Sequence, residues 1–402
     1  MIFKHFRIYK NICFCRHSSS LSTIFALATG PQLRSGVAII RVSGSLATQS
    51  LLKLTRETKL ENFKPKQLYL KKIYHHKTND LIDQCMTVWF KEPKSFTGED
   101  VVEFHIHGSK AVAGAIFSTL SSFPNYRLAE PGEFSKRAYL NGRLDLTEAE
   151  GLIDLINAQT EQQRKQSLYQ MQGSLKELYE RWRLDLVKSL AHAEAYIDFH
   201  EDQHIENDIL SDVINTVKTA YNAMSIHLQD HRRGEILRDG CRIAILGAPN
   251  AGKIDKHLSD LFTIKSSSFN SLTKLILLNK IDLTNENIRL KFQQLNDNII
   301  PISCTLGVNI EEFLSKLTKS IAEKCTEPSF TTPYLTNERH RIYLTRTVDD
   351  LLMFLTFINN NQDLVLAVEY LRLAIRSLGT VTGVVHTEEL LDVIFRDFCI
   401  GK

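Results

Sequence analysis

The spacing of two nucleotide-binding motifs constrains this chain more than any other feature of its sequence. Gly247-Ala-Pro-Asn-Ala-Gly252-Lys253 follows an apolar run and matches G-x-x-x-x-G-K, whose backbone N–H groups wrap phosphates while the lysine reaches the outer ones. Asn279-Lys280-Ile281-Asp282 follows a second apolar run, and a carboxylate there can accept both N–H donors of a guanine edge. Only 26 positions separate Lys253 from Asn279, whereas a single βαβ unit takes about 30 residues. The sequence therefore predicts an inserted P-loop α/β domain that is incomplete.

Other residues of this domain support the same interpretation. Asn250, Ala251, Gly252 and Lys253 are expected to hold phosphates, and Ser303-Cys304-Thr305 is expected to lie behind the guanine. The position after Lys253 normally supplies a hydroxyl to Mg²⁺, but here it is Ile254, which cannot be a ligand. The residues from 254 to 273 also lack a D-x-x-G turn. We interpret the chain as a truncated, exon-skipped isoform or the product of an incomplete gene model. Ordinary strand-end turns are the alternative for these motifs.

The first twenty residues have an unusual composition. They carry Lys4, Arg7, Lys10 and Arg16 together with three serines, and no Asp or Glu occurs before Glu57. This pattern is typical of a mitochondrial transit peptide, and a basic disordered tail is the alternative. We expect residues 1–22 to be the transit peptide and the protein to act in the mitochondrial matrix.

The charge and cysteine content limit the partners of the chain. Its formal net charge is +3, and without the four basic residues of the presequence it is near −1. A nucleic-acid partner must therefore be held by a local basic face or by a companion protein. Seven cysteines without a CxxC pair favour a reducing compartment. No apolar run approaches the roughly 18 residues of a membrane span.

Periodicity divides the rest of the chain into α/β and helical parts. Residues 37–42 and 101–106 read as strands in a mixed α/β first third. Thr147 and Glu150 match an S/T-x-x-E capping box, and apolar residues recur from Leu168 to Trp182 at helical spacing, which predicts one long helical segment. Residues 363–378 and 388–398 return to helical periodicity. The nucleotide domain is thus expected to be inserted in a helical domain.

Several motifs together resemble the mitochondrial members of the tRNA modification GTPase family known as MnmE or TrmE. They are the segments 23–29 with GVAIIRVSG (36–44), SFTGEDVVEFHIHG (95–108), AEPGEFSKRAYLNGRLDL (129–146), the two nucleotide motifs, and FCIGK (398–402). The resemblance implies a multidomain α+β and α protein. Its domains would be a tetrahydrofolate-binding and dimerisation domain (23–145), a helical domain in two parts (146–238 and 328–402) and a truncated G domain (239–327).

The resemblance also implies a function. Such a protein is expected to form a homodimer and to act with an FAD-dependent partner protein on tRNA, placing an aminomethyl-type group at C5 of the wobble uridine. Its cofactors would be 5,10-methylene- or 5-formyl-tetrahydrofolate, and GTP with Mg²⁺ and K⁺, the potassium contacting Asn250. The alternative is a GTPase-deficient, folate-binding dimer subunit with a regulatory or scaffold role.

By the same resemblance, Arg41, Glu103, Arg143 and Lys402 fall at folate-contacting positions. Arg143 stands where a lysine is expected in bacterial members, which keeps the charge but changes the donor geometry. The family tail returns to the folate pocket, so Cys399 is either a catalytic thiol or a buried inert one.

Strand alternation is consistent with a site on one sheet face. Val102, Phe104 and Ile106 should point to the core, and Glu103, His105 and His107 should point away from it. A carboxylate at Glu103 could accept the N–H donors of a pterin. Two alternatives remain open: a metal held by Glu103, His105 and His107, or a solvated strand face.

Overall fold

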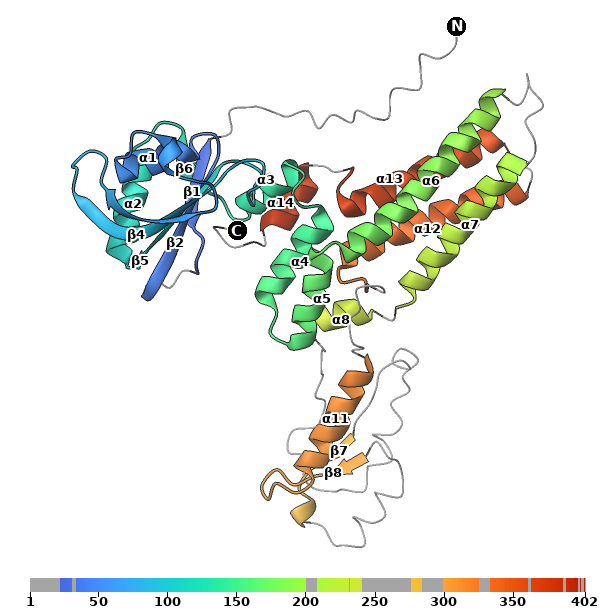
Figure 1. Ribbon diagram of the computed structural model, residues 1–402. Helices are drawn as coiled ribbons and strands as arrows, with labels where there is room; N and C mark the ends of the chain where they lie inside the picture. Colours follow the sequence, from blue (N-terminus) through green and yellow to red (C-terminus); the bar gives the residue numbers. More distant parts are fainter. Residues whose placement is uncertain are drawn as a thin grey trace. The chain divides into compact units, whose positions relative to one another are not determined.

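The computed structural model describes residues 22–30, 34–199, 208–230, 232–240, 276–283, 299–324, 333–360, 363–385, 388–396, 398 and 401 (Figure 1). The presequence up to residue 21, the phosphate loop Gly247–Lys253, Ile254, Cys399 and Lys402 lie outside these residues. The chain divides into two compact units. The first comprises Met1–Asn157, Gln170–Glu180 and Gly379–Lys402, and the second comprises Ala158–Tyr169 and Arg181–Leu378.

A six-stranded sheet forms the centre of the first unit, with the strand order β3-β4-β5-β2-β1-β6. Only the β1–β6 pair is parallel. The strands expected at 37–42 and 101–106 are confirmed as the neighbours β2 and β5. The strands are β1 (Thr23–Leu27), β2 (Ser35–Ser43), β3 (Leu68–Tyr74), β4 (Leu81–Phe90), β5 (Val101–Gly108) and β6 (Tyr126–Leu128).

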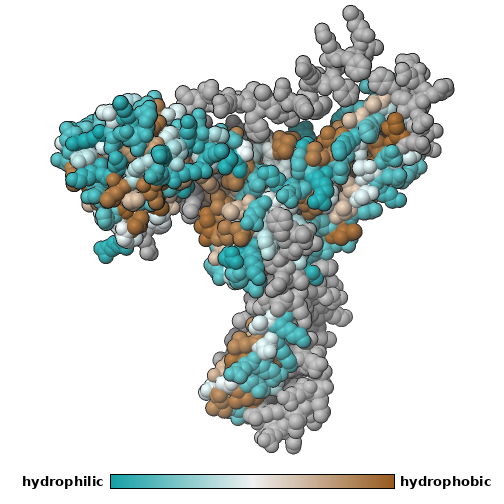
Figure 2. Space-filling view, in the orientation of Figure 1, coloured by the Kyte–Doolittle hydropathy of each residue, from teal (hydrophilic) through white to brown (hydrophobic). Residues whose placement is uncertain are grey.

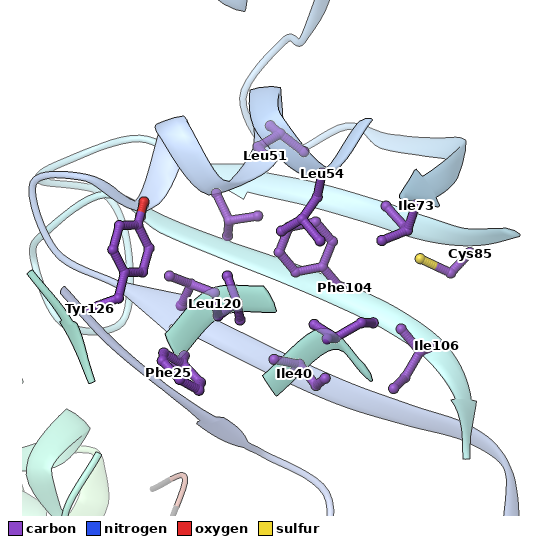
Figure 3. Packing of buried hydrophobic residues seen from close by; sticks show 14 of the residues in the cluster. Phe25, Ile40, Leu51, Leu54, Ile73, Cys85, Phe104, Ile106, Leu120 and Tyr126 are labelled. Atoms are coloured by element: carbon purple, nitrogen blue, oxygen red, sulfur yellow. The ribbon is translucent and has the colours of Figure 1, made fainter. Parts of the chain in front are cut away.

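Helices cover one face of this sheet. In Figure 3, Leu51 and Leu54 of α1 (Ala47–Thr55) and Leu120 of α2 (Lys110–Ser121) lie over Phe104 and other buried strand residues. Every second residue of β5 enters this core, as the sequence predicted, because successive strand side chains point to opposite faces. The residues between them, Glu103 and His105 among them, therefore belong to the other face.

The C-terminal part of the chain packs with the first unit. Leu391 and Phe395 of α14 (Glu388–Arg396) form a buried cluster with Tyr139 of α3 (Glu133–Leu140) and Leu146 of α4 (Leu146–Asn157). The Tyr139 hydroxyl donates to the carbonyl of Gly383 at 2.6 Å. These contacts bring the end of the chain back to the sheet domain.

The capping box predicted at Thr147 and Glu150 is wrong by two residues. The Asp145 carboxylate accepts from the backbone N–H of Glu148, and the Glu148 carboxylate accepts from the N–H of Asp145, at 2.8 and 2.7 Å. Thr147 and Glu150 are buried inside α4, which begins at Leu146. Aspartate is an effective N-cap, so the reciprocal pair forms two residues earlier in the sequence.

The single long helical segment predicted across Leu168 to Trp182 is also wrong. It is two helices, α5 (Glu161–Met171) and α6 (Ser174–Phe199), separated at Gly173. Gly173 has φ +93°, a left-handed conformation that ends helices and that glycine adopts most easily. The apolar spacing continues across the break, and Leu175 and Trp182 are both buried.

Four long helices dominate the second unit (Figure 1): α6, α7 (Asp208–Leu228), α12 (Glu338–Asn359) and α13 (Leu364–Thr382). Aromatic contacts join Trp182 to His227 between α6 and α7, and Phe357 to Tyr370 between α12 and α13. No helix among the described residues is long and apolar enough to cross a membrane.

The points where the inserted segment leaves and rejoins the bundle lie together. Arg341 of α12 donates to Asp230 at 2.7 Å, to Glu235 of α8 (Arg233–Asp239) at 2.6 Å and to the carbonyl of Leu228 at 3.0 Å. A side chain on Gly234 would meet the backbone of Leu335, which follows the insert.

The described part of the insert is a small α/β fragment. Strands β7 (Ile276–Leu278) and β8 (Ile299–Pro301) pair in parallel. The 3-10 helix η2 (Ile281–Leu283) follows β7, and helix α11 (Ile310–Lys324) follows β8. The apolar run before Asn279 is thus a strand, whereas the run before Gly247 lies outside the described residues.

Candidate functional site

An ion pair lies on the sheet face opposite the helical layer. Arg41 and Glu103 are direct partners in the β2–β5 register, and the Arg41 Nε donates to Glu103 Oε1 at 2.9 Å. The other oxygen, Oε2, lies 3.3 Å from His105 Nε2. The two paired side chains are 19% and 13% exposed, so solvent screens this pair only partly. The structure therefore brings together two of the four positions expected to contact folate.

Aromatic rings hold the arginine of this pair. The Arg41 guanidinium carbon lies 5.4 Å from the ring centroid of Phe96 and 5.7 Å from that of Phe134. Phe134 is fully buried and packs with Ile24 and Ala26, which are on the same face of β1. Cation–π contacts of this kind restrict the guanidinium, so the charge beside Glu103 is fixed in position.

A nearly buried arginine anchors the loop that carries Phe96. Arg137 of α3, 3% exposed, donates to the Glu99 carboxylate at 3.1 Å and to Glu133 Oε1 at 3.0 Å. It also donates to the carbonyl of Ser22 at 2.8 Å. Ser43, at the end of β2, donates at 2.7 Å to Glu99 Oε2, the oxygen that Arg137 contacts at 3.1 Å. Sequence reasoning missed this network because its members come from four separated segments.

The charge state of the network is well defined. Burial raises the pKa of the Glu133 carboxyl, but hydrogen bonds from Arg127 and the Glu130 N–H, and the charge of Arg137, outweigh it. The net effect is a lowered pKa for Glu133, which keeps the carboxylate ionised at neutral pH. The ionised pair with Arg137 then holds α3 against the strand end.

Arg143, the third expected position, lies at the rim of this region. Its side chain is exposed, and its N–H donates to the carbonyl of Ala138 at 2.8 Å. A Cβ on Gly98, which has φ +81°, would be 3.3 Å from Arg143 Cγ and 2.9 Å from Asn141 Cβ. The Asn141 amide donates to the Thr97 carbonyl at 2.7 Å. The loop after Phe96 therefore contacts the segment of Arg143, and this approach favours glycine at position 98.

Lys402, the fourth expected position, is outside the described residues, but its neighbour Gly401 is not. A Cβ on Gly401 would lie 2.1 Å from the carbonyl oxygen of Leu27, and its φ is +92°. Leu27 ends β1, and the preceding residue, Ala26, pairs with Arg41. The chain end is thus brought to the strand beside the Arg41–Glu103 pair.

The metal alternative for Glu103, His105 and His107 has no ligand set. His107 Nδ1 lies 2.7 Å from Asp83 Oδ1, and its side chain is 72% exposed. His105 instead faces Glu103. Within the part of the chain that the structure describes, no three His, Cys, Asp or Glu residues are grouped to hold a metal ion. The solvated-face interpretation fits His107 and not Glu103.

A second set of predicted residues meets at the ends of β7 and β8. Asn279 Oδ1 accepts from the N–H of Lys280 at 2.8 Å and from that of Cys304 at 3.2 Å. Asp282 Oδ1 accepts from the Ser303 hydroxyl at 2.7 Å. Ser303 is buried, and Cys304 and Thr305 are exposed. The N-K-x-D and S-C-T segments are therefore joined, because parallel strands place their carboxyl ends at one edge.

These observations define a class of protein: a sheet domain with a charged open face, combined with a helical domain that is interrupted by an α/β fragment. Residues 23–143 match the family model described as the GTP-binding protein TrmE N-terminus, and residues 146–399 match the MnmE helical domain. The chain belongs to the MnmE/TrmE family of tRNA modification GTPases.

Curated relatives match nearly the whole chain. The tRNA modification GTPase MnmE of Rickettsia bellii (strain RML369-C) is 38% identical over 458 aligned positions, covering 95% of this chain and all of the relative. The corresponding protein of Rickettsia prowazekii (strain Madrid E) is 37% identical over 457 positions, with the same coverage. A mitochondrial 5-taurinomethyluridine-tRNA synthase subunit of Danio rerio is 35% identical over 483 positions, covering 97% of this chain and 95% of the relative. All three alignments are longer than the 402-residue chain, so they contain gaps in it.

Proposed function

We propose that this protein acts in the modification of the wobble uridine of tRNA in the mitochondrial matrix, and that it binds a reduced folate on the open sheet face. The Arg41–Glu103 pair carries the proposal. Two further facts support it: the names of the relatives, one of them mitochondrial, and the acid-free basic sequence of residues 1–22. The proposed group is of the aminomethyl type and is added at C5.

The residues on this face fit the polar end of a folate. Glu103 offers a carboxylate whose two oxygens face Arg41 and His105, which suits the adjacent N–H donors of a pterin. Arg41 and the partly buried Phe96 provide flat surfaces beside that carboxylate, and the buried Phe134 supports Arg41. Arg143 and Lys402 supply positive charge for the glutamate end of the ligand. When bound, 5,10-methylene- or 5-formyl-tetrahydrofolate supplies the one-carbon unit.

Cys399 and the domain organisation belong to the same proposal. Cys399 precedes Gly401 by two residues in the sequence, and Gly401 packs at the end of β1, so we assign the thiol of Cys399 a catalytic role. The domains are 1–22 (transit peptide), 23–145 (folate binding and dimerisation), 146–238 and 328–402 (helical) and 239–327 (truncated G domain). The functional form is a homodimer that works with a flavoprotein carrying FAD.

Guanine recognition is assigned to the second site. Asp282, oriented by Ser303, accepts the donors of the guanine edge, and Asn279 and Lys280 hold the surrounding loop together with Cys304 and Thr305. Phosphates of GTP are assigned to Gly247 and the residues 250–253, with K⁺ at Asn250. Ile254 leaves Mg²⁺ without its usual protein hydroxyl.

A second candidate function is a GTPase-deficient, folate-binding dimer subunit with a regulatory or scaffold role. Two observations favour it: the separation of only 26 positions from Lys253 to Asn279, and alignments to full relatives that are longer than this chain. In this case the chain is a truncated isoform. A titration with GTP and Mg²⁺ separates the two functions, because only the first predicts guanine-selective binding.

The test of the folate site is a titration of the full chain with 5-formyl-tetrahydrofolate. We expect Glu103→Gln to weaken binding at least about tenfold, because hydrogen bonds to a charged group contribute about 1.5–3 kcal/mol. Glu61→Gln, an exposed change in the same unit, is the matched control and should bind as the parent does. Equal affinities for the parent and Glu103→Gln would refute the site.

A further inference from the structure

Apart from the presequence, the positive charge of this chain is concentrated in one segment of the first unit. Residues 53–77 hold eight Lys or Arg and two Glu, a net of +6, in a chain whose formal net charge is +3. The remaining residues are together net negative. A polyanion would therefore be attracted to this segment rather than to the whole molecule.

Seven of these eight basic residues are exposed and follow the edge of the sheet. We call them the basic edge: Lys53, Arg56, Lys59, Lys64, Lys66, Lys72 and Lys77. They come from the end of α1, the loop around the 3-10 helix η1 (Leu60–Asn62), the strand β3 and the turn after it. β3 is the outermost strand of the sheet, and its seven residues span about 20 Å at 3.3 Å per residue.

Local contacts hold the basic edge in place. Arg56 donates to the carbonyl of Asn79 at 2.7 Å and lies 3.8 Å over the ring of Tyr74, which joins the end of α1 to the end of β3. The Lys64 N–H donates to the Tyr69 hydroxyl at 2.8 Å, and the Lys66 N–H donates to the Trp89 carbonyl at 2.7 Å. The charges are thus attached to a fixed strand and not to a free tail.

One of the two acidic residues in this segment, Glu57, is already neutralised, whereas Glu61 is exposed. Glu57 accepts from the half-buried Lys71 at 2.6 Å, and a second hydrogen bond comes from Asn62 at 2.8 Å. Among the described residues, none of the five lysines at positions 59, 64, 66, 72 and 77 takes part in an ion pair. Their charges face solvent and are available to a partner.

We propose that the basic edge binds the phosphodiester backbone of tRNA. This inference rests on the proposed function, in which tRNA is the substrate. Phosphates along a nucleic-acid strand present repeated negative charge that several exposed lysines can neutralise together, with release of counterions. The face of this domain seen in Figure 2 is largely hydrophilic with scattered apolar patches. Leu68 and Leu70 of β3 are exposed as well, but the seven basic residues outnumber them, which suits a polyanion.

The position of the basic edge relative to Glu103 gives it a role in the reaction. β3 and β5 are separated by one strand, β4, so at about 4.8 Å per strand they lie about 10 Å apart. A tRNA backbone held along β3 can therefore present an unpaired base to the open face that carries Glu103. RNA recognition commonly uses unstacked loop bases in this manner.

The test compares two fourfold lysine-to-glutamine variants of the full chain in titrations with an unmodified tRNA transcript. The first removes Lys59, Lys64, Lys66 and Lys72, and the matched control removes the exposed lysines Lys110, Lys188, Lys218 and Lys319. We expect the first to bind at least about tenfold more weakly at low salt, and the control to stay within about twofold of the parent. The slope of log K against log salt should fall by about 3 in magnitude, since each phosphate contact contributes about 0.7–0.9.

Several outcomes would overturn the proposal. One is an equal affinity and slope for the parent and the first variant, or no tRNA binding by the parent. Another is loss of binding to phosphatidylglycerol vesicles with tRNA binding unchanged. A third is aggregation without a change in tRNA affinity, since edge lysines can also prevent strand pairing. The single variants Lys64→Gln and Lys72→Gln, each expected to lower the slope by about 1, repeat the test with minimal change.

A folate titration on the same samples separates this inference from the proposed function. Folate binding by every variant with unchanged tRNA affinity refutes the basic edge alone. Absent folate binding in the parent refutes the proposed function, while the tRNA titration still decides whether the basic edge binds RNA.

Discussion

Replacing Arg137 by methionine tests whether the buried ion network holds the sheet domain together. The change leaves Glu99 and Glu133, whose side chains are 17% and 11% exposed, without their shared positive partner. Removing one member of a buried pair typically costs about 3–5 kcal/mol. Because the two acids are partly exposed, we expect the free energy of unfolding to fall by about 3 kcal/mol. The bond to the Ser22 carbonyl is lost as well.

The two tryptophans of the chain allow this loss to be measured in one unit at a time. Trp89 lies in the sheet domain and Trp182 in the helical bundle. In a Trp182→Phe background, urea unfolding followed by Trp89 emission reports on the sheet domain alone. The control is Lys136→Met, which removes a more exposed pair with Asp392 in the same unit and should leave its stability nearly unchanged.

The pH dependence provides a second readout. Glu133 has a lowered pKa in the folded protein, so its contribution to stability is present above the ordinary pKa of about 4.5 and is lost as the pH falls through the folded value. The difference between the parent and Arg137→Met should therefore shrink in acid. A difference below about 1 kcal/mol at pH 7, or one that does not depend on pH, would refute the reasoning.

Three further predictions concern other parts of the chain. Gly401→Ala should detach the chain end from β1, because the alanine Cβ would lie 2.1 Å from the Leu27 carbonyl oxygen. The readouts are faster proteolysis of the C-terminus and weaker folate binding. Unchanged values of both would contradict this prediction. Burial lowers the pKa of the His227 imidazole to about 4, so stability of the bundle, followed by Trp182 emission in a Trp89→Phe background, should be full above about pH 6.5 and fall by roughly 3 kcal/mol toward pH 4. His227→Gln should remove most of that slope, and an identical slope would exclude His227 as its source. Burial raises the pKa of the Asp145 carboxyl to about 6, and Asp145→Asn keeps a capping oxygen. The variant should therefore leave the sheet domain at least as stable at pH 7.5, and it should abolish the gain in stability that the parent shows below pH 6. A loss of stability above about 1 kcal/mol would show that the negative charge is needed.

Local periodicity was sufficient to predict β2 and β5 and the face of the candidate site, but not the other four strands of the sheet. The alternation in β5 placed Phe104 in the core and Glu103 on the opposite face, because a strand has only two faces. The chain order of the N-K-x-D and S-C-T segments likewise predicted their meeting. These inferences need only residues near each other in the sequence or a shared sheet edge.

Contacts between distant segments were beyond such reasoning. The partners of Arg137 come from Ser22, Glu99 and Glu133, and nothing in their individual contexts indicates that they meet. The misplaced capping box had a local cause, because Asp145 and Thr147 are both acceptable caps and the position of the first helical residue decides between them. Gly173 was the feature of the sequence that could have indicated the break between α5 and α6.

The contacts around Arg341 explain how the bundle can accommodate inserts of different size. The segment before the insert is held to the segment after it by the bonds of Arg341 to Asp230 and Glu235 and by the contact of Gly234 with Leu335. None of these residues belongs to the insert itself. Once the two ends are fixed, the entropic cost of closing the connecting chain into a loop grows only with the logarithm of its length, by about 0.6 kcal/mol per doubling. Alternative splicing or gradual erosion could therefore shorten this module while the surrounding helices retain their packing, which makes the junction a tolerant position for evolutionary change.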